Sequence, residues 1–192
     1  MTKAVCILQD QGMEVAHARD DAFRRLFAAE FRYVWTSLRR LGVDSADLDD
    51  VVHEVFLAVH RRFDTYDPAR PIRPWLFAFA FRFASDYRKQ ARIRFRSSFD
   101  GDESADPRPA ADELLERAED QRLAAIGLEG IALDRRAVFI LYEIDEVPMN
   151  EIAASLGVPL HTAYSRLRVA REEFAAAVQS AERSRGARRG GR

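Results

Sequence analysis

The sequence predicts an all-α protein: two small helical domains joined by an acidic linker, the C-terminal one containing a helix-turn-helix. Three observations support this fold class. Apolar residues recur at spacings of three and four over several long stretches, which is the period of an amphipathic helix. A segment rich in acids and poor in large apolar residues divides these stretches into two groups. A chain of 192 residues is long enough for two domains of modest size.

The net charge of −1 hides a strong segregation of charge along the chain. A balanced charge argues against a nucleic-acid-binding protein, since such proteins are usually basic. However, residues 88–96 and 183–192 are basic, whereas residues 100–120 are strongly acidic. Each run alone is also what a solvated surface would carry. The net charge of the whole chain therefore does not exclude a nucleic-acid-binding protein. The charged blocks have to be interpreted separately.

The acidic segment 97–111 has no large apolar residue after Phe99 and cannot offset the entropy cost of ordering. We interpret it as a linker. The expected organisation is a first domain at 18–96, the linker at 97–111, a second domain at 112–178 and a basic disordered tail at 179–192.

The N-terminal half contains two amphipathic stretches. The first predicted helix runs from Asp20 to Leu41 and ends at Gly42. The second runs from about Ser45, the expected N-cap, to Phe63. Its outer face is acidic in the first turn, which suits the helix dipole whether or not a partner also binds there.

A third helix is predicted from Pro74 or Trp75 through Arg96. Its aromatic residues go most of the way around the helix and alternate with alanine and arginine, which superficially resembles a strand. The length, the alanines and the charged continuation favour a helix. Aromatics interleaved with arginines suit a surface that stacks single-stranded bases and follows their phosphates. A core helix with a basic exposed end explains the pattern equally well.

The C-terminal half begins with helices predicted at 114–126 and 134–144, the second with Val138, Leu141 and either Tyr142 or Ile144 facing inward. Residues 149–178 then follow the pattern of a helix-turn-helix. Small Ala153, Gly157 at the turn and small Ala163 are spaced as two closely crossing helices require. A hairpin with a merely solvated basic face accounts less well for this spacing. The side chains expected to face outward, toward a DNA major groove, are His161, Thr162, Tyr164, Ser165, Arg166, Arg168 and Arg171.

No catalytic or metal-binding motif is recognisable. His53-Glu54 begins like a metalloprotease helix, but Leu57 occupies the position of the second histidine ligand. The single cysteine, Cys6, excludes a disulfide framework and a cysteine-based zinc site. No apolar run approaches the roughly 20 residues that span a bilayer. We therefore expect a cytoplasmic protein that is not an enzyme, has no cofactor and does not insert into membranes.

Taken together, these residues resemble the extracytoplasmic-function (ECF) group of bacterial RNA polymerase sigma factors, from about Asp20 to Ala177. Residues 47–63 are similar to the acidic helix that docks on the polymerase clamp coiled coil. Residues 73–89 are similar to the promoter-melting segment, and residues 133–171 to the domain that reads the −35 element. The acidic linker is similar in place to the segment that threads the RNA exit path, although a solvated tether fits equally well.

The resemblance implies roles for individual residues. It assigns core polymerase binding to Asp49, Asp50, His53, Glu54 and Phe56, and binding and melting of the −10 element to Trp75, Phe79, Arg82, Asp86, Arg88 and Lys89. It assigns −35 binding to the outward side chains of the second helix of the helix-turn-helix. The implied partners are core RNA polymerase, through its clamp coiled coil and flap, promoter DNA and an anti-sigma factor. His53 stands where the family usually has Gln, a change that keeps hydrogen bonding. Arg82, His161 and Ala163 also depart from the commonest family residues, which leaves the promoter sequence open.

Two other classes of protein compete with this interpretation. A plain DNA-binding regulator could use the same helix-turn-helix without polymerase, but it leaves the acidic second helix and the aromatic segment unexplained. A helical adaptor that binds only a signalling protein is the second alternative. Promoter opening by the holoenzyme distinguishes a sigma factor from the plain regulator. A salt-independent complex without nucleic acid, as the only detectable binding, would favour the adaptor.

Overall fold

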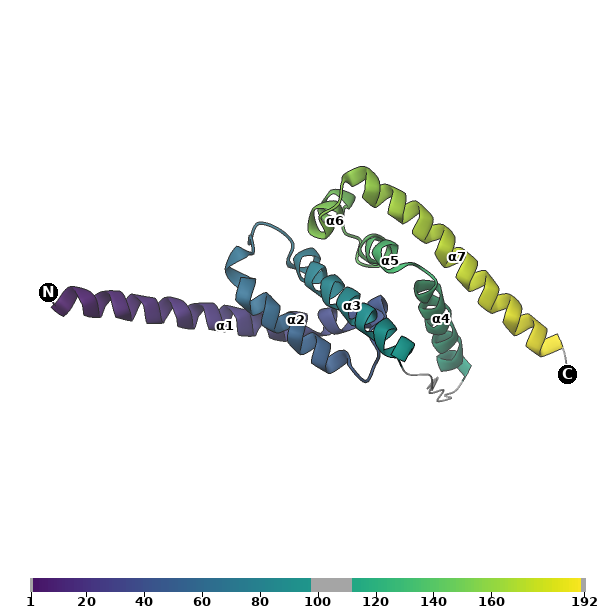
Figure 1. The fold of residues 1–192 in the computed structure, drawn as a ribbon, viewed down its shortest axis with the longest axis horizontal. Helices are drawn as coiled ribbons and strands as arrows, with labels where there is room; N and C mark the ends of the chain where they lie inside the picture. The colour runs from purple at the N-terminus through teal and green to yellow at the C-terminus, as the bar shows by residue number, and fades with distance from the viewer. Residues whose placement is uncertain (1, 98–111, 191–192) are drawn as a thin grey trace.

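The computed structural model describes residues 2–97 and 112–190, and all regular structure in these ranges is helical (Figure 1). The predicted all-α fold class is confirmed. The predicted linker lies outside the described residues except for Ser97. The helices are α1 (Thr2–Leu41), α2 (Leu48–Arg62), α3 (Ile72–Ser97), α4 (Asp112–Glu129), α5 (Leu133–Phe139), α6 (Met149–Leu156) and α7 (Leu160–Gly190).

The first three helices pack together through the C-terminal half of α1. Their inner faces carry apolar side chains at the predicted spacing, and these are buried: Val34, Leu38 and Leu41 in α1, Val52, Val55 and Val59 in α2, and Leu76, Phe77, Ala80 and Ala84 in α3. Burial of such side chains is the dominant stabilising contribution in a domain of this kind. α1 begins at Thr2 rather than near Asp20, since a helix extends readily once its first turns have formed.

The start of α2 differs from the sequence prediction. Ser45 is not the N-cap: α2 begins at Leu48, and Asp47 precedes it without making a side-chain capping bond. Asp44 instead accepts a 2.9 Å hydrogen bond from the backbone N–H of Ala46, which forms a turn before the helix. The Asp47 carboxylate accepts a 2.7 Å hydrogen bond from the hydroxyl of Tyr87 and so links α2 to α3.

In the second domain, α4 and α7 lie side by side, and α5 packs against α7 (Figure 1). Arg136 of α5 is fully buried, and its guanidinium donates hydrogen bonds to the backbone carbonyls of Ile131 and Glu129. Burial lowers the pKa of Arg136 to about 10, so the side chain stays charged at neutral pH. Arg136 thus provides donors for the last carbonyl of α4 and for the Ile131 carbonyl in the following turn.

The helix predicted at 134–144 is not regular. α5 ends at Phe139, and residues Ile140–Ile144 form a π-helical turn. Val138 and Leu141 are buried as predicted, but Tyr142 and Ile144 are 36% and 37% exposed, so neither takes the expected inward position. The wider π turn changes which side chains face the core after Leu141.

The predicted helix-turn-helix is present in α6 and α7. Gly157 has φ +66°, in the left-handed region that favours glycine, and separates the two helices. Ile152 and Ala153 of α6 are buried against Ala163 and Leu167 of α7, as the spacing predicts. The tail 179–192 was expected to be disordered, but α7 continues to Gly190. The alanines, arginines and glutamate of this segment have high helix propensity and extend an already formed helix.

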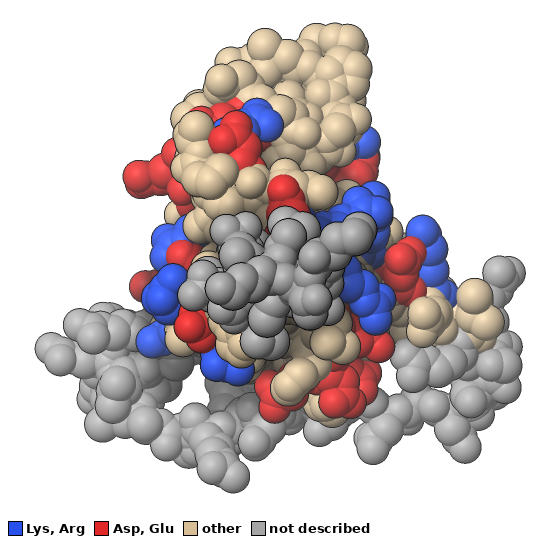
Figure 2. Space-filling model, turned by 90° about the vertical axis from the view of Figure 1, so that its left-hand side faces the viewer, with Lys and Arg blue, Asp and Glu red and all other residues tan. Residues whose placement is uncertain are grey.

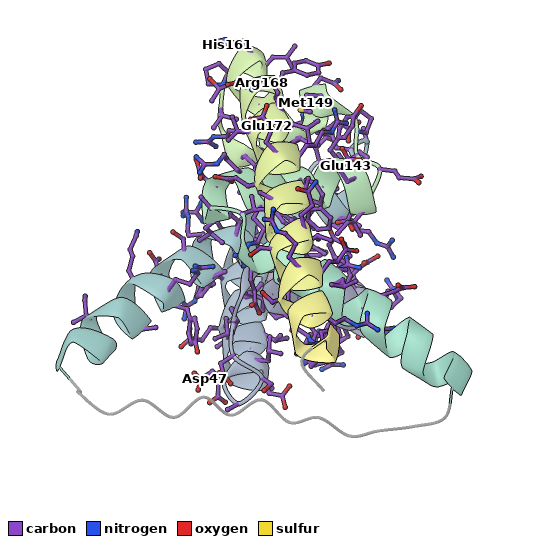
Figure 3. The ribbon with its side chains drawn as sticks, turned by 90° about the vertical axis from the view of Figure 1, so that its right-hand side faces the viewer. Asp47, Glu143, Met149, His161, Arg168 and Glu172 are labelled. Carbon is purple, nitrogen blue, oxygen red and sulfur yellow. The ribbon has the colours of Figure 1, made fainter. Side chains whose placement is uncertain are left out.

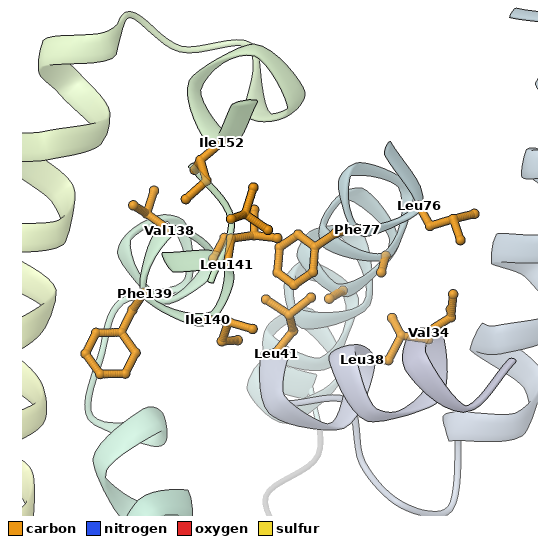
Figure 4. Packing of buried hydrophobic residues seen from close by; sticks show 14 of the residues in the cluster. Val34, Leu38, Leu41, Leu76, Phe77, Val138, Phe139, Ile140, Leu141 and Ile152 are labelled. Carbon is orange, nitrogen blue, oxygen red and sulfur yellow. The ribbon is translucent and has the colours of Figure 1, made fainter. Parts of the chain in front are cut away.

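The two domains touch each other. Buried apolar residues of both belong to one continuous cluster, and α6 packs against α3. Figure 4 shows Phe77 of α3 directed toward Leu141, and Leu41 of α1 close to Ile140. No helix in the described part of the chain is long and apolar enough to cross a membrane.

Candidate functional site

The outer face of α2 presents a compact acidic surface. Asp49, Asp50, His53 and Glu54 are all exposed. Trp35 of α1 donates a 3.2 Å hydrogen bond from Nε1 to Asp49 Oδ1, which fixes one edge of this surface. The carboxylates lie in or next to the first turn, where the helix dipole stabilises negative charge.

Phe56 does not belong to this surface, contrary to its assignment to polymerase binding. It is 3% exposed, and its ring lies 4.6 Å from that of Phe27 and stacks on that of Phe31. Leu57 is the apolar residue that faces outward, with 56% of its surface exposed. Leu57 follows His53 by four positions and therefore shares its helix face. In the sequence, Leu57 already falls outside the inner apolar stripe of this helix, and this position could have predicted that it faces outward. We refer to Asp49, Asp50, His53, Glu54 and Leu57 as the α2 surface.

A cleft of about 530 Å³ lies along α3. Five of the six residues predicted to contact the −10 element line it, namely Trp75, Phe79, Arg82, Asp86 and Lys89. The rings of Trp75 and Phe79 meet edge to face with centroids 4.9 Å apart. The cleft thus combines aromatic surfaces with cations, as recognition of unpaired bases and phosphates requires.

The charge balance of this cleft is positive. Arg62 at the end of α2 contributes a further cation that the sequence prediction missed, because it comes from another helix. The only acidic side chain among the lining residues is Asp86, which pairs with Lys89 at 3.2 Å. Arg62 and Arg82 are exposed and stay available to an anionic ligand.

Arg88 lies apart from the cleft, contrary to its predicted grouping. It is half-buried, and its Nη1 lies 3.5 Å from the backbone carbonyl of Leu41. Its charge lowers the pKa of Arg136 from the second domain, although burial of Arg136 is the larger cause. Arg88 is thus a residue of the boundary between the domains.

The helix-turn-helix carries the third set of predicted residues. His161, Tyr164, Ser165, Arg168 and Arg171 are exposed on α7, whereas Thr162 and Arg166 are half-buried. Ion pairs hold the three arginines: Arg166 with Asp134 at 3.4 Å, Arg168 with Glu172 at 2.6 Å and Arg171 with Glu143 at 2.7 Å. Each of the three guanidinium groups thus has an acidic partner within the protein itself.

The tip of the helix-turn-helix is almost free of charge. Between Glu146 and Arg166 the sequence contains one charged residue, Glu151. Figure 2 accordingly shows few charged side chains at the top of the molecule, while acidic and basic groups mix below it. In Figure 3, His161 lies at this upper end and Asp47, before α2, at the lower end. The residue that precedes α2 and the start of α7 thus lie at opposite ends of this view.

The described residues contain no cluster of three or more His, Cys, Asp or Glu side chains that could hold a metal ion. The structure offers three surfaces suited to binding: an acidic helix face, an aromatic and basic cleft, and a helix-turn-helix whose second helix carries exposed polar side chains. The fold and these surfaces are typical of a DNA-binding protein that carries a further acidic face.

Comparison with known proteins specifies the family. Residues 26–93 match Sigma-70 region 2, and residues 128–174 match Sigma-70, region 4. The ECF RNA polymerase sigma factor SigL of Mycobacterium tuberculosis is 31% identical over 156 residues, covering 81% of this chain and 88% of that protein. The RNA polymerase sigma factor CnrH of Cupriavidus metallidurans is 28% identical over 176 residues, covering 87% and 92%. The chain belongs to the ECF group of RNA polymerase sigma factors.

Solved structures agree with this assignment. CnrH in complex with the cytosolic domain of CnrY superimposes with a TM-score of 0.61 at 27% identity, covering 86% of this chain and 94% of that one. The sigma factor RpoE of Bartonella quintana, in complex with the anti-sigma factor NepR, shares the fold at 17% identity and a TM-score of 0.63, covering 82% and 97%. The protein is thus a transcription initiation factor that binds core RNA polymerase and directs promoter recognition, DNA melting and initiation.

Proposed function

We propose that the three surfaces divide the work of initiation, with residues 18–96 and 112–178 acting as the two functional units. The α2 surface docks on the clamp coiled coil of core polymerase, and Leu57 supplies an apolar centre among the carboxylates. Phe56 supports this surface from inside by packing against α1. Carboxylates around an exposed apolar residue are suited to a basic partner with a small apolar patch.

The α3 cleft receives the opened non-template strand of the −10 element. Trp75 and Phe79 provide rings for stacking, while Arg62, Arg82 and Lys89 provide cations for the phosphates. Extrusion of a base costs a few kcal/mol, which stacking and hydrogen bonds must offset. The observation that carries this proposal is the meeting of both residue types in one cleft within the part of the chain that matches region 2.

The exposed side chains of α7 read the −35 element, in the part of the chain that matches region 4. His161, Tyr164 and Ser165 lie at the start of the helix, where helix-turn-helix proteins contact bases. Thr162 and Arg171 are placed for phosphates, and Arg166 and Arg168 for guanine edges or phosphates. This domain also contacts the polymerase flap.

An anti-sigma factor is the further partner that we propose, because two structural neighbours were solved in complexes of this kind: CnrH with CnrY, and RpoE with NepR. The protein works in the cytoplasm, where core polymerase transcribes, and performs no catalysis of its own.

Co-purification with core polymerase tests the docking proposal. Glu54→Lys should weaken the complex with core at least several-fold, since it places a cation in an acidic surface, while the helix position stays exposed. Asp120→Lys, the same kind of reversal at an exposed site on α4, is the matched control and should bind like the natural protein. Equal binding by both variants would remove α2 from the polymerase interface.

A further inference from the structure

The start of α7 carries two large apolar side chains that face outward. Leu160 is 47% exposed and Tyr164 is 55% exposed. They are four positions apart, which places them next to each other on one face of the helix. Ala163 and Leu167 are buried and supply the packing face of this part of α7. Leu160 and Tyr164 therefore form an exposed apolar pair outside the core.

The residue types around this pair restrict how it can read a base. Residues 158–165 include no Arg, Lys, Asn, Gln, Asp or Glu. Paired hydrogen bonds from Arg or Lys select guanine, those of Asn or Gln select adenine, and Asp or Glu accepts from cytosine. Serine and threonine hydroxyls bond to several base edges and discriminate little. The remaining base-specific group in the major groove is the C5 methyl of thymine, which apolar side chains contact.

The arginines of α7 follow this pair and are engaged elsewhere. Arg166 pairs with Asp134 of α5 at 3.4 Å, and Arg168 pairs with Glu172 at 2.6 Å, one turn further along the helix. In Figure 3, Arg168 and Glu172 lie below His161 along α7. The cations thus begin where the uncharged tip ends, which assigns them to guanines or phosphates beside the bases that the tip meets.

We propose that Leu160 and Tyr164 determine part of the promoter specificity by contacting thymine methyl groups in the −35 element. This inference rests on the proposed function of α7 in −35 binding. Side chains four positions apart on a helix have Cβ atoms about 5–6 Å apart, whereas successive base pairs rise by about 3.4 Å. The pair therefore spans base pairs one or two steps apart. The −35 element should carry a thymine, on either strand, at one or both of these positions.

Replacement of thymine by uracil tests this contact, because it removes only the methyl group and keeps every hydrogen-bonding group of the base. Holoenzyme containing the natural chain first selects its −35 sequence from randomised duplexes. The selected duplex is then prepared with uracil at one thymine at a time, and fluorescence anisotropy measures the affinity of the holoenzyme. Removal of one contacted methyl group should weaken binding about fourfold, which corresponds to the burial of one such group.

Serine substitutions assign the contact to its residues. Leu160→Ser and Tyr164→Ser should each bind the thymine and uracil duplexes equally at the position that the lost side chain contacted. Ile144→Ser is the matched control: Ile144 is an apolar residue of the same domain, 37% exposed and outside α7. This variant should keep the discrimination of the natural chain. Circular dichroism confirms that each variant is folded.

Several results would overturn the proposal. Equal affinity of the natural holoenzyme for thymine and uracil duplexes at every position would do so, as would a selected element without A·T pairs. Discrimination that both serine variants retain would assign the methyl contact to other residues. A natural holoenzyme that selects no −35 sequence at all refutes the proposed role of α7 instead, and the two failures are thereby distinguished.

Discussion

Gly127 of α4 lies directly against the ring of Phe174 of α7: a Cβ atom at Gly127 would be 2.3 Å from Phe174 Cε2. Phe174 in turn stacks on Phe139 of α5 with ring centroids 5.0 Å apart. The absence of a side chain at Gly127 therefore permits α4, α5 and α7 to pack as one unit. This unit supports the second helix of the helix-turn-helix, because α7 supplies both the packing surface and the residues that we propose to read the −35 element.

Gly127→Ala should therefore destabilise the second domain. Overpacking of a well-filled site costs about 1–3 kcal/mol, which exceeds the gain of up to about 1 kcal/mol from the better helix propensity of alanine. Urea unfolding measures the change. Phe174→Leu in the same chain should recover part of the loss, because it removes the ring that the new methyl group meets. A Gly127→Ala variant at least as stable as the natural protein would show that the helices can move apart without cost.

Arg136→Met should also lower the free energy of unfolding. The substitution keeps an apolar stem but leaves the carbonyls of Ile131 and Glu129 without their donor, at a cost of about 1–3 kcal/mol. Arg136→Lys should not restore stability, since one ammonium cannot reproduce the planar fork. Arg122→Met at an exposed position of α4 is the control and should unfold like the natural chain. Full stability of Arg136→Met would mean that these carbonyls find other partners.

The ion pair of Arg135 and Glu173 should make the stability of the protein fall at acidic pH. Hydrogen bonding from Arg135, at 2.9 Å from its Nε, holds the pKa of Glu173 below its usual value. A carboxyl whose pKa is lower in the folded state stabilises the protein at neutral pH and loses that contribution as the pH falls through its folded pKa. Between about pH 5 and pH 3, Glu173→Gln should lose less stability than the natural chain. Thermal unfolding across this range measures the difference, and parallel curves would contradict it.

DNA binding by α7 should be sensitive to substitution of Arg166. Loss of a base contact costs about 1–3 kcal/mol, so Arg166→Ala should weaken binding of −35 duplex by that amount at constant salt slope. Asp134→Asn should weaken binding less, because it removes the group that orients Arg166 but keeps the guanidinium. Fluorescence anisotropy at several salt concentrations measures both. An unchanged affinity of Arg166→Ala would remove this residue from the readout, and a shallower salt slope would assign it to a phosphate.

Much of this architecture could be predicted from sequence, because its determinants are local. The helix-turn-helix follows from small residues and a glycine at fixed spacing, which the crossing of α6 and α7 requires. The inner stripes of α1 and α2 follow from the helical period. For the aromatic segment, the sequence did not decide between a core helix and a surface that binds single-stranded bases. The cleft beside it also includes Arg62, which comes from another helix.

What the sequence could not predict depends on contacts between distant residues. Phe56 and Leu57 are adjacent and both apolar, and only the position of α1 decides that Phe56 is buried. In the sequence, Arg88 cannot be distinguished from its basic neighbours. Only the position of the second domain makes it a boundary residue. The bond between Tyr33 and Asp145 spans 112 positions and has no local signature. The helical tail beyond residue 179 was missed because its charge pattern suggested disorder more strongly than its propensity suggested a helix.

Permanganate footprinting of a promoter selected by holoenzyme tests the central claim, that the α3 cleft holds the opened −10 strand. With the natural chain, thymines of the −10 region should become reactive. Holoenzyme carrying Arg82→Ala should still protect the −35 duplex but open several-fold less promoter, since this exposed cation of the cleft is lost. Arg122→Ala should open promoter normally. The combined variant Trp75→Ala, Phe79→Ala should also open less promoter. If Arg82→Ala and this combined variant both open as much promoter as the natural chain, the strand is held elsewhere.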